Sequence, residues 1–107
     1  MQQVTALAKD LLTTDNPYEV ALEIHGLSAH ASMGMGPADS VYLIWGELTD
    51  WMELKPEENV QAEAEMARAA QEWLSLDLAD RKAVTRYLDY WVHDVCGYAR
   101  RVGLGND

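Results

Sequence analysis

The spacing of apolar residues in the last third of the chain constrains the fold most. Between residues 78 and 102 they recur at three- and four-residue intervals, as on one face of a helix: Val84, Leu88, Trp91, Val92, Val95, Ala99 and Val102. Asp77 precedes this stretch as a candidate N-cap residue. Arg100 and Arg101 fall in its last turn, where the helix dipole favours cations, and Gly103 suits the C′ position. The sequence therefore predicts a long helix over residues 78–102, around which the other elements pack.

Four earlier segments are also predicted to be helical. The apolar residues of segment 3–14 keep helical spacing, and Pro37 and Pro56 each suit the first position of a helix. Because the residue before a proline disfavours helical geometry, the helix that begins at Pro37 should end before Pro56. The helix that begins at Pro56 should run to about Leu74.

The remaining segment, residues 16–25, gives two conflicting signals. Asn16, Pro17 and Glu19 resemble a capping box with proline at the first helical position. Residues 18–25 nevertheless alternate with the two-residue period of a half-buried strand. We interpret them as a helix, because no second strand is predicted with which they could pair. The glycines and serines of residues 26–36 predict a loop.

These segments together predict one all-α domain over residues 1–107. Hydrophobic residues make up 49% of the chain and charged residues 24%, values typical of a folded globular protein. The length suits a single core, and the predicted connections are short. We therefore expect an irregular bundle of four to five helices, with the long helix 78–102 at its centre.

The charge of the chain limits its partners. Eighteen acidic and eight basic side chains give a formal net charge of −10, which disfavours direct binding to nucleic acid or to an anionic membrane. A partner with a basic surface would instead be attracted. Cys96 is the only cysteine, so no intrachain disulfide can form, and no apolar run approaches the thickness of a bilayer. We expect a cytoplasmic protein.

Acidic residues are densest between residues 47 and 80, where ten carboxylates accompany only two basic side chains. Such a surface either docks on a basic patch of another protein or is a solvated face that keeps the protein soluble. On the first interpretation we predict a partner-binding surface made of Glu47, Asp50, Glu53, Glu57, Glu58, Glu65 and Glu72.

A basic stripe is predicted on the outer face of the last helix. It consists of Lys82, Arg86, His93 and Arg100, with Tyr90 beside it. Basic residues with an interleaved aromatic ring can hold phosphate or a nucleobase. Given the net acidity, we favour the alternative that the stripe pairs with acidic helices of the same or a second molecule.

The histidines do not form a recognisable metal or catalytic motif. His93 and Cys96 are three residues apart on one helix, but they diverge around its axis, so no metal site and no cofactor are predicted. His25, His30 and Asp39 lie in or near the glycine-rich segment, without a nucleophile elbow or phosphate loop to frame them. A small enzyme or ligand-binding bundle with a pocket near these three residues remains an alternative interpretation.

The leading hypothesis from the sequence is a non-enzymatic inhibitor. It would use its acidic face to occupy a basic surface on another protein, such as a nuclease or another nucleic-acid-binding protein. In size, charge and helical character the chain is similar to nuclease-immunity proteins and to inhibitors that mimic nucleic acid, although it shares no motif with them. A further alternative is a homodimer or larger homo-oligomer built on apolar residues outside the core faces, such as Leu43, Met33 and Met35.

Overall fold

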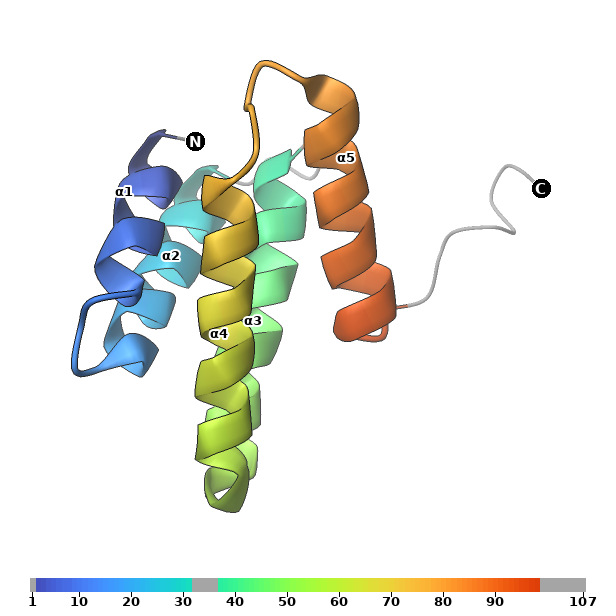
Figure 1. Ribbon diagram of the computed structural model, residues 1–107. Helices are drawn as coiled ribbons and strands as arrows, with labels where there is room; N and C mark the ends of the chain where they lie inside the picture. The colour runs from blue at the N-terminus through green and yellow to red at the C-terminus, as the bar shows by residue number, and fades with distance from the viewer. Residues whose placement is uncertain (1, 32–36, 99–107) are drawn as a thin grey trace.

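The computed structural model describes residues 2–31 and 37–98, and all of their regular structure is helical. It contains five α-helices, which confirms the all-α prediction for this part of the chain (Figure 1). They are α1 (Gln2–Leu11), α2 (Pro17–Ala31), α3 (Pro37–Leu54), α4 (Asn59–Leu74) and α5 (Arg81–Asp89). A 3₁₀ turn, η1 (Pro56–Glu58), precedes α4, and a π-helical segment, η2 (Tyr90–Val95), continues α5.

The longest helices, α3 and α4, form the middle of the bundle. Figure 1 shows α1 and α2 on one side of this pair and α5 on the other. Helices α1 and α2 pack on each other, while α2 also packs along α3 and α1 along α4. None of the described helices combines the length and the apolar character that crossing a membrane requires.

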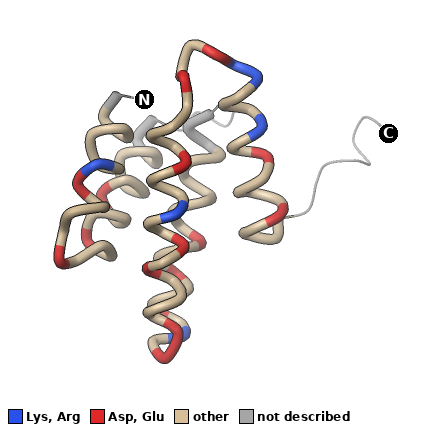
Figure 2. The backbone as a smooth tube through the Cα atoms, in the orientation of Figure 1, with Lys and Arg blue, Asp and Glu red and all other residues tan. Residues whose placement is uncertain are grey.

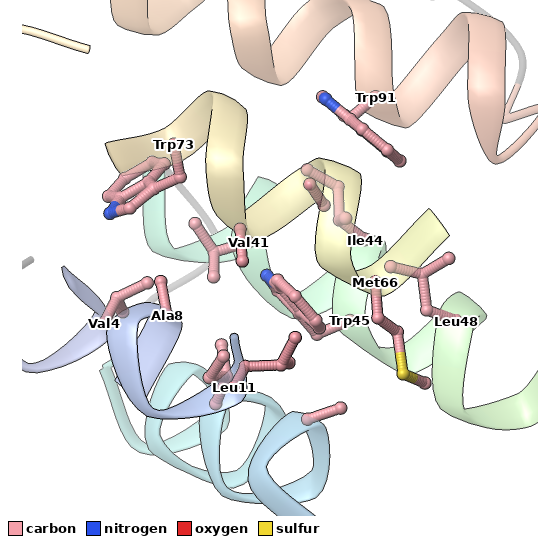
Figure 3. Close-up of a cluster of buried hydrophobic side chains, with 14 of the residues drawn as sticks. Val4, Ala8, Leu11, Val41, Ile44, Trp45, Leu48, Met66, Trp73 and Trp91 are labelled. Carbon is pink, nitrogen blue, oxygen red and sulfur yellow. The ribbon is translucent and has the colours of Figure 1, made fainter. Parts of the chain in front are cut away.

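The core lies where these helices meet. Figure 3 shows Val4, Ala8 and Leu11 of α1 in the same buried cluster as Trp45 of α3, with Trp91 of η2 at the opposite side. Helix α4 contributes small side chains as well as large ones, and its buried residues are Ala62, Met66, Ala69, Ala70 and Trp73. Alanine at these positions lets neighbouring helices approach closely.

The helical interpretation of residues 18–25 is confirmed, and an N-cap formed by the Asn16 side chain explains where α2 begins. The side-chain oxygen of Asn16 accepts a hydrogen bond from the backbone N–H of Glu19 at 3.3 Å. The amide group of Asn16 also donates to the carboxylate of Glu19 at 2.9 Å. Asn16 thus satisfies the Glu19 N–H, one of the groups that a helix start leaves without a partner, while its own backbone N–H donates to the hydroxyl of Thr14 at 3.1 Å. The two-residue alternation was therefore the weaker signal.

The predicted loop over residues 26–36 is wrong for its first part, because α2 continues through Gly26 to Ala31. Ser28 is buried, and its hydroxyl donates to the carbonyl oxygen of Ile24 at 2.8 Å within the helix. Packing of this turn against the bundle outweighs the low helix propensity of glycine and serine. Residues 32–36 lie outside the described part of the chain.

The long central helix 78–102 is not confirmed in the predicted form. Helix α5 begins at Arg81, and Asp80 is its N-cap residue, accepting a hydrogen bond from the backbone N–H of Ala83 at 3.2 Å. Asp77 instead accepts from the N–H of Ala79 in the preceding turn. The helix lies at one side of the bundle rather than at its centre (Figure 1).

The described part of this helix also ends earlier than predicted. The segment η2 ends at Val95, and Gly97 follows with a φ of +84°, a left-handed conformation that glycine adopts without strain. Beyond it, the backbone N–H of Tyr98 donates to the carbonyl oxygen of Val92 at 3.0 Å. Gly97 thus has the role that the sequence analysis gave to Gly103, and residues 99–107 lie outside the described part.

Candidate partner-binding surface

Five of the seven predicted partner-binding acids lie close together along the sequence where α3 ends and α4 begins. Glu47, Asp50, Glu53 and Glu57 are exposed, whereas Glu58 is half-buried. Figure 2 shows acidic positions gathered along the lower halves of α3 and α4 and at the turn between them. We call Glu47, Asp50, Glu53, Glu57 and Glu58 the acidic tip.

The acidic tip borders a groove of about 400 Å³. One wall comes from the last turns of α3 and from η1, and the other from the end of η2. The apolar lining consists of Leu48, Trp51, Leu54, Val95 and Cys96. The charged lining consists of Glu47, Asp50, Lys55 and Glu58, three acids and one base. The groove therefore combines apolar contact area with a negative potential.

A short hydrogen bond fixes one wall of the groove. The indole N–H of Trp51 donates to Oε1 of Glu58 at 2.6 Å, which joins the end of α3 to η1. A hydrogen bond to an ionised acceptor is shorter and stronger than one between neutral groups. It holds the indole ring and the carboxylate in a defined orientation at the edge of the groove.

Two tyrosines bind other carboxylates of the acidic tip. The hydroxyl of Tyr18 on α2 donates to Oε2 of Glu53, and that of Tyr98 donates to Oε1 of Glu47 at 3.4 Å. The hydrogen bond to Glu53 raises the pKa of Tyr18, while burial and the charge of Glu47 raise the pKa of Tyr98. A tyrosine hydroxyl is protonated at neutral pH even at its ordinary pKa, and the raised pKa values extend its ability to donate to more alkaline pH.

The other two predicted acids, Glu65 and Glu72, have different surroundings. Both accept from the guanidinium of Arg68, at 2.7 Å and 3.2 Å. Glu72 also accepts from the indole N–H of Trp91 at 2.9 Å, and the guanidinium carbon of Arg68 lies 4.4 Å from the centre of that ring. The hydrogen bond with Glu65 raises the pKa of Arg68. Glu72 and Arg68 therefore hold α4 against η2, while Glu65 pairs with Arg68 within α4.

The predicted basic stripe divides into separate environments. His93 lies 3.6 Å from the carboxylate of Asp89, and its Nδ1 lies 2.8 Å from the carbonyl oxygen of Tyr98. The hydroxyl of Tyr90 accepts from Arg68 at 3.1 Å, so it contacts α4. Lys82 and Arg86 are exposed and line a shallow hollow together with Arg81 and Thr85, and Arg100 lies outside the described residues.

The residues considered for catalysis or metal binding are used in packing where their side chains are described. The ring of His25 stacks on Tyr42 with centroids 4.3 Å apart, and its Nδ1 lies 3.2 Å from the Tyr42 carbonyl oxygen. The side chains of His30 and Asp39 are outside the described part. Within that part, no three His, Cys, Asp or Glu side chains gather where they could hold a metal ion.

Cys96 lines the groove but is a poor nucleophile. Burial, with a smaller contribution from Glu47, raises the pKa of its thiol to about 12. The reactive form of cysteine is the thiolate, and very little is present at neutral pH when the pKa is this high. The thiol therefore contributes apolar surface to the groove.

Sequence reasoning missed two exposed apolar residues beside the acidic tip. The side chains of Leu54 and Val60 are 79% and 80% exposed. A signal was present, since Leu54 directly precedes Lys55 and Pro56 at a predicted helix end, where no further turn can cover it. Exposed apolar residues surrounded by charge are typical of interaction sites.

The chain matches no protein-family model, and comparison with curated proteins and with solved structures gives no match either.

Proposed function

We propose that this protein is a non-enzymatic binding protein whose acidic tip occupies a basic surface of another protein, one that normally holds nucleic acid. The supporting observation is the exposure of Glu47, Asp50, Glu53 and Glu57 at one end of the bundle. None of these four carboxylates forms an ion pair with another described residue, whereas Glu65 and Glu72 pair with Arg68. The charge of the acidic tip is thus available to a partner.

A surface of this kind acts mainly on the rate of association. Clustered carboxylates produce a negative potential that draws a basic partner into encounter and orients it, and dissolved salt screens this attraction. A partner that holds nucleic acid presents lysines and arginines spaced to meet phosphates. Carboxylates held on a rigid helical hairpin can meet the same groups, and occupation then blocks the nucleic acid.

The structure narrows the set of acids on which this proposal rests. Glu65 and Glu72 already bind Arg68, so they are weaker candidates for partner contact than the five carboxylates of the acidic tip. Glu53 accepts from Tyr18 and also links α2 to α3. Asp50 and Glu57 are exposed, and Glu47 accepts only a long hydrogen bond of 3.4 Å from Tyr98, so replacing these three carboxylates should test binding with the least structural disturbance.

The experiment compares two variants with the same loss of charge. The protein and its Glu47→Gln/Asp50→Asn/Glu57→Gln variant are used as bait in an extract of the native cells, and the captured protein is identified and purified. The control variant is Asp10→Asn/Asp15→Asn/Glu23→Gln, which removes three charges from exposed positions on the α1–α2 side. Binding of the purified partner is then measured at several salt concentrations and in competition with nucleic acid.

We expect the acidic-tip variant to bind at least about tenfold more weakly, mainly through a slower association rate, and the control to lose less. Binding should weaken steeply as salt rises, and nucleic acid should compete for the partner. An affinity that is indifferent to salt, or an equal loss in both variants, would contradict the proposal. A partner without a basic surface would also contradict it.

A further inference from the structure

We infer that the groove beside the acidic tip anchors an amphipathic basic segment of the partner. In this arrangement an apolar side chain of that segment lies against Trp51 and Leu54, and a neighbouring lysine or arginine meets Glu47, Asp50 and Glu58. The inference rests on the proposed function and adds to it the chemistry that the partner must present at the point of contact.

The charge of the groove lining favours a basic segment as its occupant. The groove lining carries three carboxylates and one ammonium group, so it repels an acidic segment and attracts a basic one. Glu58 is fixed by its hydrogen bond from Trp51, and Glu47 accepts from Tyr98. These acceptors are held in place before the partner arrives, which lowers the entropic cost of binding.

The apolar lining favours a ligand with an apolar side chain over a polycation that has only polar groups. Leu54 is 79% exposed although it belongs to the groove, so water covers an isobutyl side chain that a partner could cover instead. Leu48 also lines the groove and is almost fully buried, so it adds apolar surface that is held in place by the core. Removing such apolar surface from water is favourable in proportion to its area.

The second wall favours a segment that can enter between two helices. Val95 and Cys96 come from the end of η2, whereas Trp51 and Leu54 come from α3. A side chain in the groove is therefore contacted from two sides. A helical segment with lysine and leucine at positions i, i+3 and i+4 can place both kinds of side chain on one face.

The test uses a defined peptide, so it does not depend on identifying the natural partner. The probe is an acetylated and amidated helical peptide of alanine, lysine and leucine, with lysine and leucine on one face. A second peptide has serine in place of leucine at the same charge, and spermidine provides a polycation without apolar side chains. Binding to the 107-residue chain is measured by calorimetry at near-physiological salt.

The chain offers a matched pair of variants. Leu54→Ser and Val60→Ser remove equally exposed side chains next to the acidic tip, but only Leu54 lines the groove. We expect Leu54→Ser to weaken the leucine peptide about tenfold, because it removes most of one buried apolar contact, and Val60→Ser to change it less than about twofold. Circular dichroism confirms that both variants are folded.

Different outcomes separate this inference from the proposed function. If Glu47→Gln/Asp50→Asn weakens peptide binding but Leu54→Ser does not, the acidic tip binds by charge alone and the groove inference is overturned. The same holds if the serine peptide or spermidine binds as tightly as the leucine peptide. If neither variant affects binding, both proposals fail. If the protein alone sediments as a dimer that Leu54→Ser dissociates, a second copy occupies the groove and the inference is overturned.

Discussion

Gly46 of α3 lies directly against the imidazole ring of His25 on α2. A Cβ atom at position 46 would come within 2.7 Å of Cε1 of His25, closer than side chains approach each other in proteins. The ring cannot easily move away, because it stacks on Tyr42 and its Nδ1 contacts the Tyr42 carbonyl oxygen. The absence of a side chain at this position therefore sets how closely α2 and α3 approach.

We predict opposite effects for alanine at two glycines. Gly46→Ala gains helix propensity, about 1 kcal/mol, but overpacking against His25 costs ~1–3 kcal/mol, so a net loss of stability is expected. Gly26→Ala on α2 meets no atom within 4 Å and should stabilise the protein by ~0.5–1 kcal/mol. Urea unfolding measures the change in the free energy of unfolding for both variants. A Gly46→Ala variant as stable as Gly26→Ala would show that α2 and α3 are not in close contact there.

A second prediction concerns the start of α5. Because the Asp80 carboxylate accepts from the Ala83 N–H, Asp80→Ala should lower the free energy of unfolding by ~0.5–2 kcal/mol. Asp77→Ala removes the same charge from the preceding turn and should change it by less than ~0.5 kcal/mol. Thermal unfolding of the two variants measures the difference. A larger loss of stability for Asp77→Ala than for Asp80→Ala would show that Asp77 is the N-cap residue.

The success of the sequence predictions depended on whether a signal was local. Pro37 and Pro56 marked helix starts, and the pairing of Asn16 with Glu19 is made within one turn. The sequence predicts Asp77 as the N-cap residue of the last helix, whereas Asp80, which carries the same side chain three residues later, forms the cap. The propensity of Gly26 favours a loop, but α2 continues through it because the helix packs on the rest of the bundle.

Of the candidate site, only the negative charge could be predicted from the sequence. The density of acids between residues 47 and 80 is visible in the sequence, and five of the seven predicted acids do lie around one helix connection. The groove could not be predicted from the sequence, because its lining combines Val95 and Cys96 at the end of η2 with Leu54 of α3, about forty residues earlier in the chain. The separate environment of Glu72 likewise depends on Trp91, nineteen residues further along the chain.

The third prediction is a loss of stability at alkaline pH. The Tyr87 hydroxyl is buried and donates to the Ala69 carbonyl oxygen at 2.8 Å, and burial raises its pKa far above the ordinary value. Burial likewise raises the pKa of Cys96 from 9.0 to about 12. Both groups stay protonated in the folded protein and ionise more readily on unfolding. Above about pH 9 the unfolded state therefore binds fewer protons, and stability should fall as pH rises towards about 12.

This pH dependence can be assigned by substitution. Tyr87→Phe should cost ~1 kcal/mol at neutral pH because it removes a hydrogen bond to Ala69, yet it should reduce the alkaline slope. Combining it with Cys96→Ala should flatten the slope further. The free energy of unfolding is measured by denaturant titration from neutral to alkaline pH. An unchanged slope in the double variant would show that other groups cause the alkaline loss.

The last prediction separates carboxylates that hold the fold from those offered to a partner. Trp91 is buried, and its indole N–H donates to the Glu72 carboxylate, so Glu72→Ala removes a hydrogen bond to a charged group and should cost ~1–3 kcal/mol. Glu57 is exposed at η1, and Glu57→Ala should change stability by less than ~0.5 kcal/mol.

A third variant distinguishes the lost acceptor from the lost charge. Glu72→Gln keeps an oxygen for the Trp91 indole while weakening the ion pair with Arg68, which is partly exposed and still binds Glu65. It should therefore be more stable than Glu72→Ala. Chemical unfolding monitored by tryptophan fluorescence compares all three variants. Equal stability of Glu72→Ala and Glu57→Ala would mean that Glu72 does not hold α4 against η2, and it would return Glu72 to the set of acids available for a partner.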